Sequence, residues 1–229
     1  MEAKIGKSYL TGIPHEGGRL TFQYPAFRGY YKDVASAIDN DSLKRPNSAE
    51  TASLVYGAVK NKAGKYEAEI IKILNDAWLW EFTGNLYLPK SNKEINNGVI
   101  LENNPQILNG KLVMDKNNLI KKLKENDSNV KFVPFGYKTG EQNLLELQKN
   151  PYIIARYGEE GAQKLAEIAS NYKSNPKLWS FDSVDEEKIR ISALGGGWDS
   201  GGSLDVSGVG WNDGDHGRAF GVDNTKKNE

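Results

Sequence analysis

The residues best suited to binding or chemistry gather near the carboxyl end of the chain, in the segment 194–222, which reads LGGGWDSGGSLDVSGVGWNDGDHGRAFGV. This segment contains ten of the 24 glycines and two of the five tryptophans of the chain, but no Lys, Glu or Gln. Small polar side chains beside a few aromatic ones are typical of adaptable binding surfaces. We therefore expect the segment to carry the functional surface.

Catalytic motifs with a recognisable spacing are not indicated. The chain has two histidines, His15 and His216, and neither accompanies the Gly-x-Ser-x-Gly motif of a serine nucleophile. We expect His15 to be exposed in a loop near a flexible end. The glycines 195–197 begin neither of the common phosphate-binding patterns. An enzyme acting on glycans or nucleosides stays open as an alternative, and it would need a buried pair of carboxylates in a pocket.

A calcium site is a second alternative for the same segment. Trp211, Asn212 and Asp213 are followed closely by Asp215, and carboxylate and amide oxygens are the ligands that calcium prefers. A Trp-Asn-Asp triplet occurs in calcium-dependent sugar lectins, although the partner triplet with a central proline and the cysteines of those lectins are missing here. The alternative function is therefore a calcium-dependent carbohydrate-binding lectin with Asp213 and Asp215 at the metal. The leading interpretation has no cofactor.

Composition restricts the partners of the chain. Thirty basic and thirty acidic residues cancel, so we expect no nucleic-acid partner. No segment approaches the roughly 20 apolar residues of a membrane span, so we expect no membrane insertion and no removed leader. The absence of cysteine excludes disulfides and thiolate metal sites, and it fits synthesis in a reducing cytoplasm, with a virion or a cell surface as the place of action.

Periodicity predicts an alternation of helices and strands that would position the segment. Helices are expected over 26–38, 47–61, 65–82, 116–125, 141–149 and 159–172. Strands are expected over 16–24, 86–89, 98–101, 130–135, 178–181 and 188–193.

Three local signals make these predictions more specific. Asn47 with Glu50 has the spacing of a capping box, and Asp115 stands where a helix cap is expected. Pro134 predicts an edge position for its strand. The strongest helical stripe lies in 65–82, where we expect Trp80 to pack in the core.

No internal repeat or linker divides the chain. We therefore expect a single α+β domain over 16–223, preceded by a tail over 1–15 and followed by a polar tail over 224–229. The oligomeric state is not indicated.

The pattern GGGWDSGGSLDVSG followed by RAFGV resembles the end of C-type-lectin-like domains of the formylglycine-generating-enzyme type. It is more closely similar to the variable region of target proteins of diversity-generating retroelements, in which a reverse transcriptase copies a template with errors at adenines and overwrites this region. The upstream block 131–169 resembles a segment of such target proteins as well. The resemblance implies a C-type-lectin-like fold, with small antiparallel sheets, flanking helices and long irregular segments.

The amino acids present give this resemblance an independent check. Randomising the two adenines of an AAC or AAT codon cannot yield Lys, Glu, Gln, Met or Trp. Between Asp199 and Ala219 only Trp211 lies outside the accessible set. The composition therefore supports the resemblance, with an ordinary loop rich in Gly, Asp and Ser as the alternative.

The resemblance implies a division of the segment into frame and variable positions. The implied inward-packing frame is Trp198, Leu204, Val206, Phe220 and Val222. The implied exposed, ligand-binding positions are Asp199, Ser200, Ser203, Asp205, Ser207, Gly208, Val209, Gly210, Asn212, Asp213, Asp215, His216 and Gly217, with Trp211 as a fixed residue that either packs or lies in the binding surface. Because the enzymatic relatives of this fold need cysteines, it implies a non-enzymatic protein that binds a protein or glycan on a cell or host surface.

Overall fold

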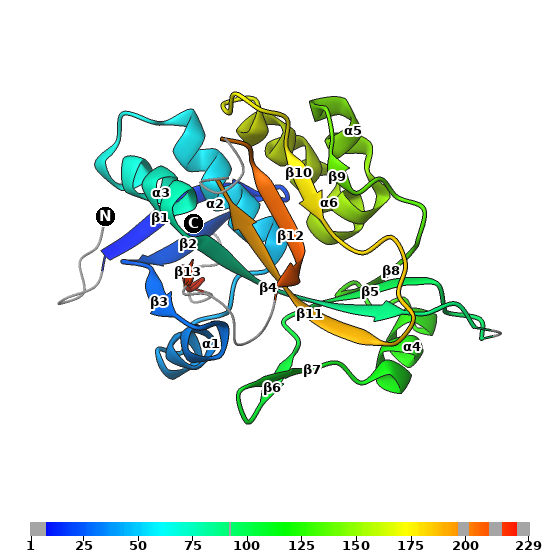
Figure 1. Cartoon of the computed structure of the whole chain (residues 1–229). Coiled ribbons are helices and arrows are strands. Elements are labelled where there is room, and N and C mark those ends of the chain that lie inside the picture. Colours follow the sequence, from blue (N-terminus) through cyan, green and yellow to red (C-terminus); the bar gives the residue numbers. More distant parts are fainter. Residues whose placement is uncertain (1–7, 92, 197–201, 211–216, 224–229) are drawn as a thin grey trace.

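The computed structural model describes residues 8–91, 93–196, 202–210 and 217–223. This part of the chain is a mixed α+β structure in which six helices surround a twisted central sheet (Figure 1). The helices are α1 Tyr31–Asn40, α2 Ser48–Lys60, α3 Lys65–Asp76, α4 Lys116–Lys124, α5 Leu144–Lys149 and α6 Pro151–Ala169.

The largest sheet among the described residues has nine strands. Its main path runs β3-β13-β4-β11-β12-β10-β9, and β5 pairs with β4 and β8 beside that path. These strands are β3 Phe27–Gly29, β4 Trp78–Leu88, β5 Gly98–Asn103, β8 Val130–Pro134, β9 Gly140–Glu141, β10 Lys177–Trp179, β11 Lys188–Gly195, β12 Asp205–Gly210 and β13 Gly217–Ala219. Two hairpins complete the strands: β1 Ser8–His15 with β2 Gly18–Tyr24, and β6 Gln106–Leu108 with β7 Lys111–Val113.

Strand β4 is the centre of this sheet, because it pairs with β13 and β5 along one edge and with β11 along the other. Its side chains enter two cores. Leu79 and Tyr87 pack in the core that contains α2, α3 and α6, whereas Trp80, Phe82 and Leu86 pack in the core that contains α1 and α4. Successive strand residues point to opposite faces of a sheet, so both faces of β4 are buried.

This two-sided burial corrects the helix predicted over 65–82. Helix α3 ends at Asp76, Ala77 is extended, and the chain continues as β4 from Trp78. An apolar run that is buried on both faces of a sheet cannot be distinguished from a helical stripe by periodicity alone. Trp80 is buried in the core as predicted, although it lies on a strand.

Three other local predictions agree with the structure. The capping box at α2 is confirmed, because the Asn47 side chain accepts from the Glu50 amide at 2.9 Å and the Glu50 carboxylate accepts from the Asn47 amide at 2.9 Å. The Asp115 cap of α4 is confirmed by its acceptance of the Asn118 amide. Strand β8 pairs with β5 alone among the described strands, as Pro134 predicts.

Some predicted helix starts were wrong. Residues 27–29 form β3, so α1 begins at Tyr31, and α5 begins at Leu144. Helix α6 spans Pro151–Ala169, but Gly158 has non-helical backbone angles (φ 72°, ψ 169°) that divide it into two helical parts. The helix start predicted after Gly158 is thus confirmed by this kink, and the helical part that begins at Pro151 was missed. A glycine adopts a positive φ without strain.

The amino-terminal tail predicted over 1–15 is wrong for residues 8–15, which form β1 against β2. Tyr9 is buried, and Ile13 packs against the main core. The other end of the domain is fastened to the same hairpin. The Gln23 amide donates to the Gly221 carbonyl and the Asp223 amide donates to the Thr21 carbonyl, both at 2.8 Å. The two ends of the described chain therefore stabilise each other.

None of the helices within the described ranges is long and apolar enough to cross a bilayer.

His15 ends β1 and is largely buried, so its predicted position in an exposed loop is wrong. Its Nδ1 atom lies 3.0 Å from the Ser53 hydroxyl, and the Lys164 ammonium donates to the same hydroxyl at 2.9 Å. Lys164 also donates to the Pro14 carbonyl at 2.9 Å. Burial lowers the pKa of His15, with the nearby Glu16 carboxylate opposing that effect. The neutral imidazole is therefore the form that the folded protein favours.

This contact predicts a specific pH dependence of stability. The folded pKa of His15 lies below the ordinary value of 6.5. The contribution of the neutral imidazole to the free energy of unfolding is therefore present above pH 6.5, and it is lost as the pH falls through the folded pKa. The His15→Gln variant should lose this part of the pH dependence, and His216→Gln should keep it. Urea denaturation of both variants and the wild type across mildly acidic pH measures the effect. Parallel wild-type and His15→Gln profiles would contradict it.

Candidate functional site

The predicted functional segment divides into described and undescribed parts. Strand β11 leads into it, β12 lies between β11 and β10, and β13 lies between β3 and β4. The following predicted site residues lie outside the described residues: Trp198, Asp199, Ser200, Trp211, Asn212, Asp213, Asp215 and His216. Both candidate calcium ligands belong to this set. Within the described ranges, no group of three or more His, Asp or Glu residues could hold a metal ion.

The exposure predicted for the variable positions is wrong for Ser203, just before β12, and for much of β12 itself. Ser203 is 0% exposed, Asp205 is 4% exposed and Ser207 is 7% exposed. Gly208 and Gly217 are also buried, while Val209 and Gly210 are half-buried. The physical reason is that β12 is an internal strand covered by α6, with β10 and β11 on its two edges.

The predicted frame residues that the structure describes are buried, as expected. Leu204, Val206, Phe220 and Val222 are each at most 2% exposed, which confirms the predicted inward packing. Their role as a frame for a variable face stays a prediction.

Close contacts restrict what the glycines of the segment can become. A Cβ atom on Gly208 would lie 2.0 Å from the Tyr152 hydroxyl oxygen, and one on Gly217 would lie 2.3 Å from the Trp80 ring. At Gly210 a Cβ atom would lie 2.8 Å from Ile191. Any side chain at these three positions would force the core to move.

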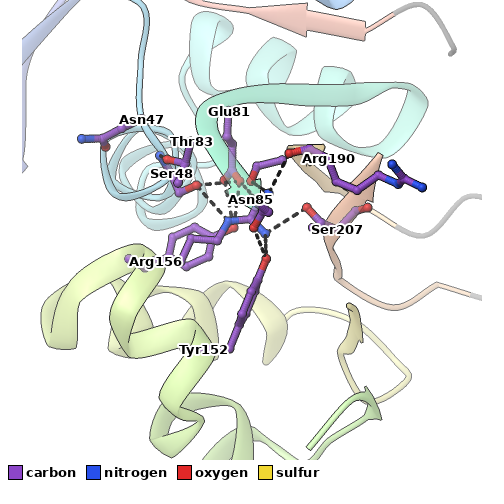
Figure 2. Close-up of polar contacts among 12 residues, drawn as sticks. Asn47, Ser48, Glu81, Thr83, Asn85, Tyr152, Arg156, Arg190 and Ser207 are labelled. Carbon is purple, nitrogen blue, oxygen red and sulfur yellow. Dashed lines mark hydrogen bonds and ion pairs between the residues drawn. The ribbon is translucent and has the colours of Figure 1, made fainter. Parts of the chain in front are cut away.

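A buried ion pair lies behind β12 (Figure 2). The Arg156 guanidinium of α6 donates to the Glu81 carboxylate of β4, and neither side chain has any exposed surface. The Tyr157 hydroxyl donates to the same carboxylate at 3.0 Å, and Ser48 donates to it at 3.1 Å. Burial raises the pKa of Glu81, whereas the charge of Arg156 and these hydrogen bonds oppose that rise.

The same arginine holds β12 through its main chain. Arg156 Nη1 donates to the Ser207 carbonyl at 2.9 Å, while Arg156 Nε donates to Ser48 Oγ at 2.9 Å. The next carbonyl of β12, that of Gly208, accepts from the Tyr87 hydroxyl at 2.9 Å. Two successive carbonyls of the strand are thus bound by core side chains.

Two further residues connect this network to β11. The Tyr152 hydroxyl donates to Asn85 Oδ1 at 2.6 Å. Asn85 Nδ2 donates to the Arg190 carbonyl at 3.2 Å and to Ser192 Oγ at 2.9 Å. Figure 2 shows Tyr152 and Asn85 pointing toward each other beneath the strands. Because every group is buried and satisfied, the network is suited to fixing strands and is closed to a substrate.

This network was not predicted from the sequence. The available signal was one charged residue inside each of two apolar runs, Glu81 in WLWEF and Arg156 in IIARY. Such a charge must find a partner when its run is buried, but the partner is 75 residues away in the sequence.

Comparisons of the chain with protein-family models, with curated proteins and with solved structures gave no match.

The buried pair predicts a large effect of removing one partner. Arg156→Met leaves the Glu81 carboxylate buried and unpaired, and it should reduce the free energy of unfolding by about 3–5 kcal/mol. The double variant Glu81→Leu with Arg156→Met should lose less than the sum of the two single variants, because no isolated charge remains. Guanidinium denaturation at neutral pH measures all three.

The matched control is Lys138→Met, which removes an exposed ion pair with Glu146 and should leave unfolding nearly unchanged. Additive losses in the double variant would show that Glu81 and Arg156 do not depend on each other.

Proposed function

We propose that this chain is a non-catalytic binding protein of the C-type-lectin-like type, similar to the variable proteins of diversity-generating retroelements. Its ligand is a protein or glycan on a cell or host surface, and it acts at a virion or cell surface after synthesis in the cytoplasm. The mixed α+β architecture is compatible with that fold. The proposed ligand-binding residues lie in 197–201 and 211–216, together with Val209.

One observation carries this proposal: the core holds β12 by the carbonyls of Ser207 and Gly208. A main-chain hydrogen bond does not depend on the side chain of the residue that makes it. A strand held in this way can present neighbouring segments of changing sequence without changing its own position.

The glycines that border 197–201 and 211–216 support the same division between fixed and variable positions. Gly196 precedes 197–201, and a Cβ atom there would lie 2.2 Å from Asn75 Oδ1. Gly202 follows that segment with a positive φ of 85°. Gly210 and Gly217 flank 211–216 and are closely contacted by Ile191 and Trp80. A substitution at each of these glycines would therefore be strained or would displace a neighbouring group, so diversification would be confined between these positions.

The variable positions are accordingly fewer than those predicted from the sequence. The positions that would vary freely are Asp199, Ser200, Asn212, Asp213, Asp215 and His216. The buried positions that would stay fixed are Ser203, Asp205, Ser207, Gly208 and Gly217.

Two display libraries test this function. Library one randomises the six freely varying positions, and library two randomises the five buried positions. We expect most clones of library one to resist protease digestion and most clones of library two to be digested, because additions at Gly208 and Gly217 overpack the core. Both libraries are then selected on the same immobilised sialylated glycoprotein.

Library one should yield specific binders and library two should not. Protease-sensitive clones throughout library one, or a folded library one without binders, would overturn the proposal.

A further inference from the structure

A groove adjoins the proposed recognition segment. It lies where the ends of α2, α3 and α6 meet, and it is bordered by Gly196 and Gly202, the described residues on either side of 197–201. The groove encloses about 510 Å³, which is within the range of small-ligand sites. The groove therefore lies next to both described ends of that segment.

The charge of the groove is positive. Lys62 and Lys173 line it and are exposed, and none of its described lining residues is Asp or Glu. Neither lysine forms an ion pair with a carboxylate in the described ranges. The nearby Lys60, by contrast, is paired with Glu167. Two cations that are not neutralised by carboxylates favour an anionic ligand.

The rest of the lining suits a ring that bears hydroxyl groups. The Tyr172 hydroxyl donates to Asn75 Oδ1 at 2.9 Å, which orients the Asn75 amide and leaves its Nδ2 as a donor. Burial raises the pKa of Tyr172 to about 12, so this hydroxyl stays protonated at neutral pH. Val59 and Ile71 supply apolar surface beside these polar groups. Apolar walls with a few oriented polar groups are typical of small-ligand sites.

We propose that this groove binds a carboxylate-bearing sugar. Lys62 and Lys173 bind the carboxylate, Asn75 and Tyr172 bind ring hydroxyls, and the apolar wall contacts the ring. The inference rests on the proposed function, whose glycan ligand it makes more specific. The groove residues are fixed, so they would provide a constant anchor beside a segment of changing sequence.

Titration with free N-acetylneuraminic acid, followed by heteronuclear NMR, tests the inference. The wild type should show saturable shifts at groove residues, weakened by added salt because the contact is electrostatic. The Lys62→Gln and Lys173→Gln double variant should bind about tenfold more weakly or worse, as expected for lost charge-assisted hydrogen bonds. The methyl ester of the same sugar, which lacks the charge, should bind the wild type as weakly as the acid binds the double variant.

The matched control is Lys131→Gln, an exposed lysine on β8 that does not line the groove. It should bind like the wild type. The inference would be overturned if the wild type bound the acid and the ester equally, or if it bound no sugar. It would also be overturned if the Lys131→Gln control lost as much affinity as the double variant. Binding of an Asp- and Glu-rich peptide without binding of the sugar would also overturn it, and it would assign the groove to acidic proteins.

Failure of the groove inference and failure of the proposed variable surface give different results. If the libraries yield binders but the groove variants bind the sugar as the wild type does, only the groove inference fails. If the groove binds the acid but the libraries do not fold, only the proposal of a variable surface fails.

Discussion

The buried pair of Glu81 and Arg156 is the interaction on which the rest of this structure depends. Two charges without exposed surface must remain paired, because an isolated buried charge is strongly unfavourable. The pair comes from β4 and α6, and Ser48 at the start of α2 bonds to both partners. The position of the pair therefore fixes one strand and two helices relative to one another. Strand β12 is then placed by Nη1 of the same guanidinium, which donates to the Ser207 carbonyl.

Under the proposed function, the placement of β12 separates the fixed positions of the segment 194–222 from the variable ones. Main-chain carbonyls of β12 are bound by core side chains, and apolar residues such as Leu204 and Val206 fill the core. The glycines that border the two segments 197–201 and 211–216 are closely contacted at positions 196, 210 and 217, and Gly202 has a positive φ. These contacts place the stabilising interactions in the strands, and the proposed function assigns recognition to the two segments between them.

The sequence predicted those features that depend on neighbouring residues. The capping box of Asn47 and Glu50 is local, and so is the effect of Pro134 on its strand. Features that depend on distant residues were missed. The run after Asp76 became β4 because both of its faces are covered by helices, and residues 8–15 became β1 because β2 and Lys164 hold them. Small polar residues such as Ser207 were expected to be exposed, but they are buried because β12 is an internal strand.

Diversification confined between fixed strand positions is tested most directly by sequencing the DNA that surrounds the gene. We expect an adjacent reverse-transcriptase gene and a near-copy of the DNA that encodes 194–222, with differences only where the copy has adenine. Those differences should fall in codons such as those for Asp199, Asn212 and Asp213. Differences at other bases, or adenine differences concentrated in the codons of Asp205, Ser207 and Gly208, would contradict the division of this segment into a fixed frame and a variable surface.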